Sequence, residues 1–274
     1  MLIKRALLAF AGTFFFSLIA AADVLWDNGT FVTSGISLSI GWNQTATTPF
    51  RYAITDDFTL TSPAKLTQLT VWGYMTGNTS SESQIIDAYA RFLTDVNGAP
   101  GDEFSGSLSE PRPFTATFTG SYYSSGTTRP IYRVDIDLGG LRLCPGTYWL
   151  QFNLDNNDIR PQTGTATANY FTTIVPLPPP EANGYHYDVL GNVYFILDDP
   201  NTGAGNQAPF RLEGDPLPTC AVAGDFDNDG ICTPDDAPDF VNALLAGTFD
   251  GCADLNSDCE VNGLDVQAFV EHAL

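Results

Sequence analysis

Aspartates near the end of the chain follow a spacing that suits a hard metal ion. Four of them stand at positions 1, 3, 5 and 12 of a twelve-residue segment that begins at Asp225, and Gly230 stands at position 6, where the chain must turn sharply. Alternate residues of a tight loop can aim their carboxylates inward, and calcium takes about six to eight oxygen ligands. The spacing predicts a calcium loop with ligands from Asp225, Asp227, Asp229, the carbonyl of Ile231, Thr233 and Asp236.

The same pattern returns 29 residues later, beginning at Asp254. The offset also pairs apolar positions, since Phe240 aligns with Phe269, and a repeat that matches acidic and apolar positions together is hard to obtain by accident. Cys259 stands where the first loop has glycine, so the sequence leaves open whether the second loop binds calcium. The second loop is predicted to use Asp254, Asn256, Asp258, the carbonyl of Glu260, Asn262 and Asp265.

Each loop leads into one predicted helix, at 236–246 and 264–273, and no helix precedes either loop. A loop followed by a single helix, twice within residues 220–274, resembles a type I dockerin. The resemblance implies a small α-helical module that docks to a cohesin-like or cell-envelope protein. Because the module has few apolar residues and twelve acidic ones, we also predict that it requires Ca²⁺ to fold. It covers about a fifth of the chain, and we treat residues 220–274 as a separate calcium-binding module.

The charge of the chain supports a divalent cation and excludes polyanionic partners. The formal net charge is −21, and residues 220–274 hold 12 Asp or Glu and no Lys or Arg. Such a density of like charge repels itself unless cations neutralise it. Nucleic acid and anionic lipid both require clustered Lys and Arg, so neither is expected as a partner.

The first 22 residues read as a secretory signal peptide. Lys4 and Arg5 precede an apolar run over 6–19, and three alanines follow at 20–22. The apolar run is shorter than the roughly 20 residues that a membrane span needs, so we expect cleavage rather than anchoring. The mature chain is therefore expected to be secreted, outside the cell or at its surface.

Five cysteines in an exported chain predict disulfides. Four of them lie in residues 220–274 and allow three pairings, which sequence alone does not resolve. Proximity along the chain suggests Cys220 with Cys232 and Cys252 with Cys259. Cys144 is then left as a buried thiol.

Residues 23–214 show the pattern of an antiparallel β domain, with short β-branched and aromatic runs between Gly, Pro, Asn and Ser clusters. About ten strands in a domain of this size fit an antiparallel β-sandwich of jelly-roll type. Asp56-Asp57-Phe58 is interpreted as a turn that buries Phe58, and the prolines of 215–219 indicate a linker. The clearest strands are predicted at 65–72, 85–93, 114–119, 131–138, 146–152 and 193–197.

Two stretches, 53–73 and 144–150, are similar to secreted bacterial β-sandwich modules that accompany dockerin-like tails. That likeness implies a fold and a location but no activity. Four tryptophans could form a sugar-stacking platform, although buried strand aromatics explain most of them. His186 is interpreted as a half-exposed strand or loop residue.

No catalytic motif anchors an enzyme. The two histidines are too few for a histidine-built zinc site, and neither a serine elbow nor a phosphate loop occurs. The sequence therefore favours a non-catalytic secreted protein whose β-sandwich binds a glycan, such as a polysaccharide, or another surface ligand. Two alternatives stay open: a polysaccharide-degrading glycoside hydrolase that carries a dockerin-type tag, and a structural surface protein. The ligand of the β domain and the docking partner are not identified by the sequence.

Overall fold

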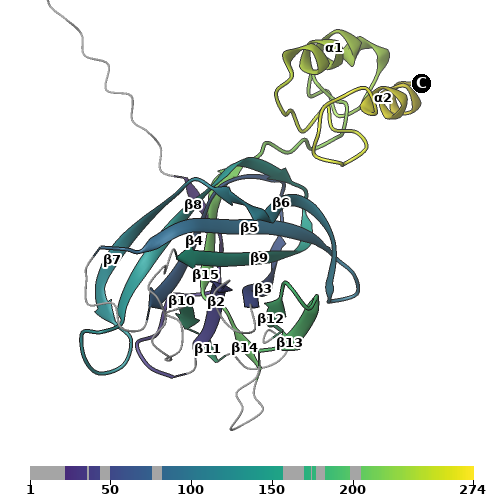
Figure 1. Cartoon of the computed structure of the whole chain (residues 1–274). Coiled ribbons are helices and arrows are strands. Elements are labelled where there is room, and N and C mark those ends of the chain that lie inside the picture. Colours follow the sequence, from purple (N-terminus) through teal and green to yellow (C-terminus); the bar gives the residue numbers. More distant parts are fainter. Residues whose placement is uncertain are drawn as a thin grey trace, which may run out of the picture.

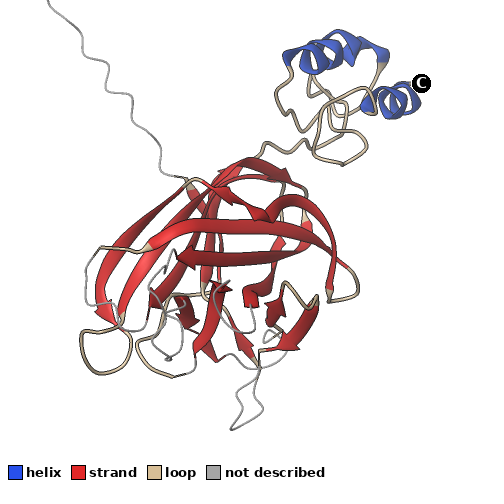
Figure 2. Ribbon diagram, viewed as in Figure 1, coloured by secondary structure: helices blue, strands red, loops and turns tan. Residues whose placement is uncertain are grey.

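The computed structural model describes residues 22–35, 37–43, 50–75, 82–156, 170–173, 175–176, 183–197 and 205–274. The fold is mainly β, and every strand pairing within these residues is antiparallel. Helices occur only after residue 233 in the described part of the chain (Figure 2). The predicted signal peptide lies almost wholly outside the described residues.

One large sheet of 13 strands contains two long halves. The first half has β4 at its centre, paired with β15 on one side and β8 on the other. Its strands, in spatial order, are β1 (Asp23–Asp27), β15 (Phe210–Pro216), β4 (Ala64–Met75), β8 (Pro130–Leu143) and β7 (Phe114–Tyr122).

The second half has β9 and β3 at its centre, and Figure 1 shows β5 and β9 crossing the front of the β region. Two strands, β2 (Ser37–Asn43) and β10 (Tyr170–Thr173), connect it to the first half. A separate pair is formed by β11 (Val175–Pro176) and β14 (Asn206–Gln207). The strands of the second half, in spatial order, are β6 (Pro100–Arg112), β5 (Ile85–Asp95), β9 (Gly146–Asn156), β3 (Phe50–Leu60), β12 (Tyr185–Asp188) and β13 (Val193–Ile196).

The main apolar core draws side chains from both halves, because alternate residues of each strand point to the same side. In β8, Val134, Ile136 and Leu138 are buried, while the charged residues between them face the other way, as the sequence predicted. From the second half, Phe58 and Phe152 are fully buried in the same core.

All six predicted strands are present, and most extend further than the prediction. The structure differs at Asp56 and Asp57, which lie inside β3 rather than in a turn, although Phe58 is buried as expected. Sequence propensity disfavours two adjacent aspartates in a strand, but hydrogen bonds described below hold Asp56 there. β6 was also missed, because its Gly, Ser and Pro residues are typical of a loop, and Pro111 is tolerated in a strand that pairs on one side only.

The predicted linker begins two residues too early. Asp215 and Pro216 belong to β15, and Pro216 pairs with Ala64, the first residue of β4. Gly214 lies at a bulge where the backbone passes so close to the carbonyl oxygen of Lys65 that a Cβ would collide with it. The glycine therefore serves strand pairing, and the connecting segment is reduced to a few residues after Pro216.

The segment after Cys220 contains a short 3-10 helix, η1 (Pro234–Asp236), followed by α1 (Ala237–Ala246), and then α2 (Asp265–Ala273). The two helices agree with the predicted ones to within one residue. Phe240 and Phe269, the residues that the repeat pairs, stack with their ring centroids 4.3 Å apart at the centre of a small core. Among the described residues, neither helix combines the length and apolar character needed to cross a membrane.

Candidate metal centre

The first predicted loop is closed by its own carboxylates. Asp225 and Asp236 are 4% and 2% exposed, although they lie in a loop of an acidic module. The backbone takes a positive φ at Asn228 (61°) and at Gly230 (98°), so the chain turns where the pattern requires it. Asparagine and glycine are the residue types that adopt this conformation most readily.

Three carboxylates of the first loop converge. One oxygen from each of Asp225, Asp227 and Asp236 lies within 4.8 Å of the others. No Lys or Arg occurs anywhere in residues 220–274 to balance them. Three negative charges at this separation repel unless a cation lies among them, and oxygen donors of this type suit calcium or magnesium.

Backbone amides hold these carboxylates in position. Asp236 Oδ1 accepts hydrogen bonds from the backbone N–H groups of Phe226 (2.8 Å) and Asp227 (3.2 Å), and its Oδ2 accepts one from Thr233 (2.8 Å). These N–H donors, with Thr233 contributing most, lower the pKa of Asp236 below its ordinary value despite its burial. Each oxygen of Asp225 accepts one backbone hydrogen bond, from Asp229 or from Gly230, and therefore retains a lone pair that a cation could use.

The second loop repeats this hydrogen-bond pattern at the same offset of 29 residues. Asp265 accepts from Leu255 (3.0 Å), Asn256 (3.3 Å) and Asn262 (2.9 Å), as Asp236 accepts from Phe226, Asp227 and Thr233. Asp254 accepts from Asp258 (3.0 Å) and Cys259 (3.0 Å), as Asp225 accepts from Asp229 (3.1 Å) and Gly230 (3.0 Å). The sequence repeat is therefore a repeat of loop conformation.

The remaining predicted ligands lie in the loops, but their side chains also bond locally. Asp229 accepts from the backbone of Ile231, and the Thr233 hydroxyl accepts from the backbone N–H of Asp235 at the start of η1. In the second loop, Asn256 donates to Asp258 and Asn262 donates to Glu260. Within the described residues, only the first loop brings three carboxylates within 4.8 Å of one another. Burial raises the pKa of Asp254, although the N–H groups of Cys259 and Asp258 oppose the rise.

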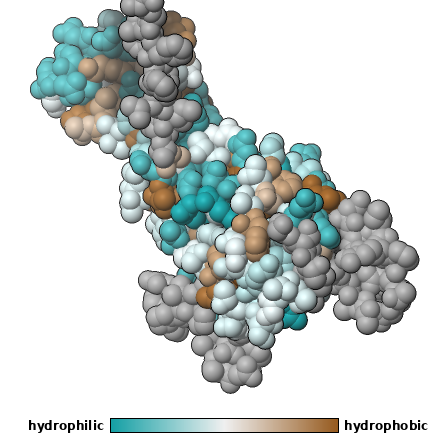
Figure 3. Space-filling view, turned by 90° about the vertical axis from the view of Figure 1, so that its left-hand side faces the viewer, coloured by the Kyte–Doolittle hydropathy of each residue, from teal (hydrophilic) through white to brown (hydrophobic). Residues whose placement is uncertain are grey.

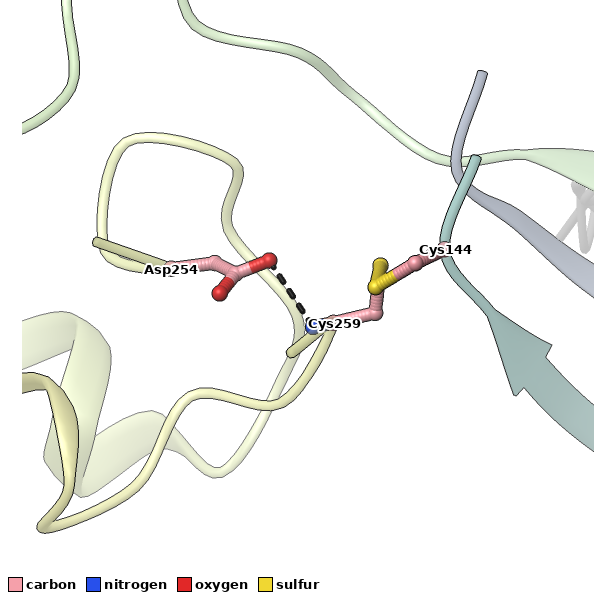
Figure 4. A group of neighbouring side chains, drawn as sticks. All are labelled: Cys144, Asp254 and Cys259. Atoms are coloured by element: carbon pink, nitrogen blue, oxygen red, sulfur yellow. Dashed lines mark hydrogen bonds between the residues drawn. A yellow bond between two sulfur atoms is a disulfide. The ribbon is translucent and has the colours of Figure 1, made fainter. Parts of the chain in front are cut away.

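The cysteine pairing differs from the prediction. Cys259 forms a disulfide with Cys144, which follows β8 in the β domain, and their Cα atoms are 5.4 Å apart (Figure 4). Cys144 is therefore not a buried free thiol. Cys259 has a φ of 61°, and its backbone N–H bonds to Asp254, so the cross-link leaves from the turn of the second loop.

The second disulfide joins Cys220 to Cys252, so both guessed pairings are wrong. The backbone N–H of Gly224 bonds to the carbonyl of Cys252 (2.9 Å), which brings the segments before the two loops side by side. Cys232 is free and packs against the small core. The repeat could have indicated that Cys232 packs against this core, because the 29-residue offset aligns it with Val261, another residue of the same core.

Trp72, Trp149, His186 and Asp56 all lie within strands of the β domain. Trp72 and Trp149 are buried, and His186 is half-buried in β12 against the ring of Tyr52, with centroids 4.4 Å apart. The carboxylate of Asp56 accepts hydrogen bonds from the backbone of Ala208 (2.8 Å) and from Asn28 (3.4 Å). These donors indicate a structural role for Asp56.

The first loop fits a hard divalent cation better than any other group of residues that the structure describes. The other cluster of potential ligand atoms contains Asp254 with Cys144 and Cys259, but the two sulfur atoms are bonded to each other. Comparison of the chain with protein-family models, with curated proteins and with solved structures found no match.

Proposed function

We propose that this chain is a secreted calcium-binding protein. Its tail, residues 220–274, acts as a dockerin-like docking module, and its β domain acts as a jelly-roll-like β-sandwich that binds a glycan or another surface ligand. The observation that carries the proposal is the duplicated set of carboxylate-to-backbone hydrogen bonds in two acidic loops that lack any basic residue. A core shared by both halves of the large sheet supports the sandwich.

Calcium would bind the first loop through Asp225, Asp227, Asp229, the carbonyl of Ile231, Thr233 and Asp236. In the second loop it would use Asp254, Asn256, Asp258, the carbonyl of Glu260, Asn262 and Asp265. The ion would neutralise carboxylates that now face one another across less than 4.8 Å in the first loop. Because the apolar core of the tail is small, this neutralisation is expected to contribute much of the stability of the tail.

Docking to a cohesin-like or cell-envelope protein is supported by apolar side chains on the outside of the tail. Val241 and Val270, which the repeat aligns, are 48% and 43% exposed, and Leu245 is 80% exposed. Figure 3 shows hydrophobic surface beside hydrophilic surface on the tail. Exposed apolar side chains framed by acidic ones are typical of a surface that binds another protein.

Titration calorimetry of the full secreted chain with CaCl₂, after removal of metal by EDTA, tests the proposal. Loops of this class in extracellular modules bind calcium with a Kd of about 10⁻⁴ to 10⁻³ M. Asp225→Asn is expected to weaken binding at the first loop by about tenfold or more, because one converging carboxylate loses its charge. Asp239→Asn, on an exposed residue of α1, removes the same charge outside the loops and should leave the affinity within about twofold.

Absence of binding heat at millimolar calcium would overturn the proposal. Equal effects of Asp225→Asn and Asp239→Asn would also contradict it, because they would indicate diffuse charge rather than a loop site. Release of reducing sugar from a polysaccharide, abolished by a single carboxylate substitution in the β domain, would replace glycan binding by glycoside hydrolysis.

A further inference from the structure

The outer face of the second half of the large sheet has short polar side chains at its centre and long aromatic and arginine side chains on both sides. On β9, Leu150, Phe152 and Leu154 point into the core, so Gln151 and Asn153 point to the opposite face. Strand pairing aligns Gln151 with Thr55 of β3 on one side and with Arg91 of β5 on the other, and these side chains therefore share a face.

Long side chains meet above these short ones. The Arg91 guanidinium lies 5.4 Å from the centre of the Tyr187 ring. Arg91 is on β5 and Tyr187 on β12, and β9 and β3 run between them. Three strand spacings separate the two backbones by about 14 Å, so the side chains must lean over the intervening strands to come this close. They lie above a floor formed by Gln151, Asn153, Thr55 and Ala53.

The floor contains polar atoms whose hydrogen-bonding capacity is unused. Asn153 and Thr55 are both 0% exposed. Within the described parts of the chain, neither the Asn153 side-chain amide nor the Thr55 hydroxyl has a hydrogen-bond partner. Leaving such groups buried and unpaired is unfavourable, whereas their neighbour Gln151 accepts a hydrogen bond from Arg91 (2.6 Å) and donates one to Tyr194 (2.8 Å). An amide offers both donors and an acceptor, and a hydroxyl offers one of each, which suits a ligand rich in hydroxyl groups.

The aromatic rings and the balanced charge of this face limit the class of ligand that it suits. Tyr185, Tyr187 and Tyr194 contact one another along β12 and β13, with ring centroids 4.6 to 5.6 Å apart where they meet. Such rings can pack against the C–H face of a sugar. The charge of Arg91 is matched by Glu103 at 2.6 Å, and the chain as a whole carries −21, so an anionic ligand gains little here.

We propose that Thr55 and Asn153 form the floor of a binding site for a neutral saccharide, which enters when Arg91 and Tyr194 move away from Gln151. The proposal rests on the proposed function, because it assigns the glycan-binding role of the β domain to one face. Arg91 and Tyr194 are only half-buried, so both can change rotamer without any strand moving. Tyr187 is 6% exposed, and its hydroxyl donates to Asn192 (2.8 Å), so this ring stays in place as a wall of the site.

Two near-isosteric substitutions test the site in the full chain. Thr55→Val removes the hydroxyl, and Asn153→Leu replaces the unpaired amide with an apolar group of similar size. Since both groups lack partners, neither change should lower the melting temperature. The probes are soluble neutral hexasaccharides of glucose, xylose and mannose, with a hexasaccharide of galacturonic acid as the charged comparison, all measured by titration calorimetry. Gln68→Leu, at a half-buried position on β4 in the other half of the sheet, is the control for loss of a polar side chain elsewhere; Gln68 donates hydrogen bonds to Asp135 and Glu213.

We expect wild type to bind at least one neutral hexasaccharide. Thr55→Val and Asn153→Leu should each weaken that binding by about tenfold or more. Gln68→Leu should leave it unchanged. Neutral-sugar binding that survives both substitutions would overturn the site while leaving glycan binding by the β domain intact. Binding of galacturonate alone would overturn the neutral ligand class. Absence of binding by wild type to every probe would remove both the site and the glycan-binding role.

Discussion

Asp56 shows how one buried carboxyl can make the stability of the β domain depend on pH. Its side chain is 0% exposed, and burial raises the pKa of this carboxyl well above its ordinary value. Hydrogen bonds from the backbone N–H groups of Ala208 and Asp57 and from Asn28 oppose the rise. A carboxyl with a raised pKa binds its proton more readily in the folded state, so folding gains stability as pH falls through the folded-state pKa toward about 3.9.

Asp56→Asn should therefore flatten the pH dependence of unfolding. We expect the melting temperature of wild type to rise relative to that of Asp56→Asn between pH 7 and pH 5, since each unit of raised pKa corresponds to about 1.4 kcal/mol. Thermal unfolding followed by tryptophan fluorescence measures this difference. Asp215→Asn controls for the loss of one negative charge at an exposed position. Parallel changes in wild type and Asp56→Asn would show that this carboxyl contributes no such pH dependence.

At the scale of elements, the two tail helices depend on one aromatic pair. Phe240 of α1 and Phe269 of α2 are 3% and 6% exposed and stack against each other, while few other side chains in that core are fully buried. A core this small offers little redundancy, because the only other buried members of this cluster are Ala253 and Leu255.

Phe240→Ala is expected to unfold the tail and spare the β domain. Truncation of a buried phenylalanine costs about 3–5 kcal/mol, which is comparable to the whole stability of a module of this size. Circular dichroism at 222 nm in saturating calcium should show loss of the helical signal, while tryptophan fluorescence of the β domain is unchanged. Val241→Ala, at the neighbouring and half-exposed position, should lose no more than about 0.5 kcal/mol. Full helicity in Phe240→Ala would contradict the role of the stacked pair.

The sequence pattern predicted those secondary-structure elements whose signal lies in neighbouring residues. The alternation in β8 and the 29-residue repeat were sufficient to place a strand, two loops and two helices. β3 could not be anticipated in the same way, because Asp56 and Asp57 are poor strand residues that are held by partners distant in the chain, Asn28 and Ala208. The cysteine pairs were missed for a related reason: Cys144 and Cys259 are separated by 115 residues, and only the three-dimensional fold brings them together.

The calcium ligands remain a prediction from spacing, which the loop geometry accommodates. The candidate saccharide site had no sequence signal, since Thr55, Arg91, Asn153 and Tyr187 lie on four different strands. Their proximity depends on strand order and register, and register is set by long-range pairing that a single sequence does not display.

At the scale of the whole molecule, the Cys144–Cys259 disulfide links the β domain to the second acidic loop. Closing a loop of 115 residues restricts the unfolded chain, an effect of about 4–5 kcal/mol in the chain-entropy description. The cross-link also limits where the tail can lie, because the tail is otherwise held to β15 by a few residues after Pro216.

Removal of this cross-link should release the tail without unfolding it. The double variant Cys144→Ser, Cys259→Gly lacks the disulfide. Glycine readily adopts the positive φ that Cys259 has, so the conformation of the second loop is retained and only the cross-link is lost. We expect a larger radius of gyration in small-angle scattering and a loss of about 2–5 kcal/mol in the free energy of unfolding. Cys232→Ala, which leaves both disulfides in place, should not change the radius of gyration. Non-reducing peptide mapping that found Cys144 unpaired in wild type would refute the linkage.

Two covalent routes between tail and body have a mechanical consequence. If the backbone alone joined the tail to the β domain, the β domain could rotate freely relative to the tail and to a partner bound by the tail. The disulfide from Cys259 adds a second covalent connection to the β domain. A force applied to the tail is therefore shared between the end of β15 and the turn that joins β8 to β9. If the tail docks and the β domain binds a glycan as proposed, this fixed orientation would favour contact with an extended, immobile polymer over capture of small ligands that diffuse freely.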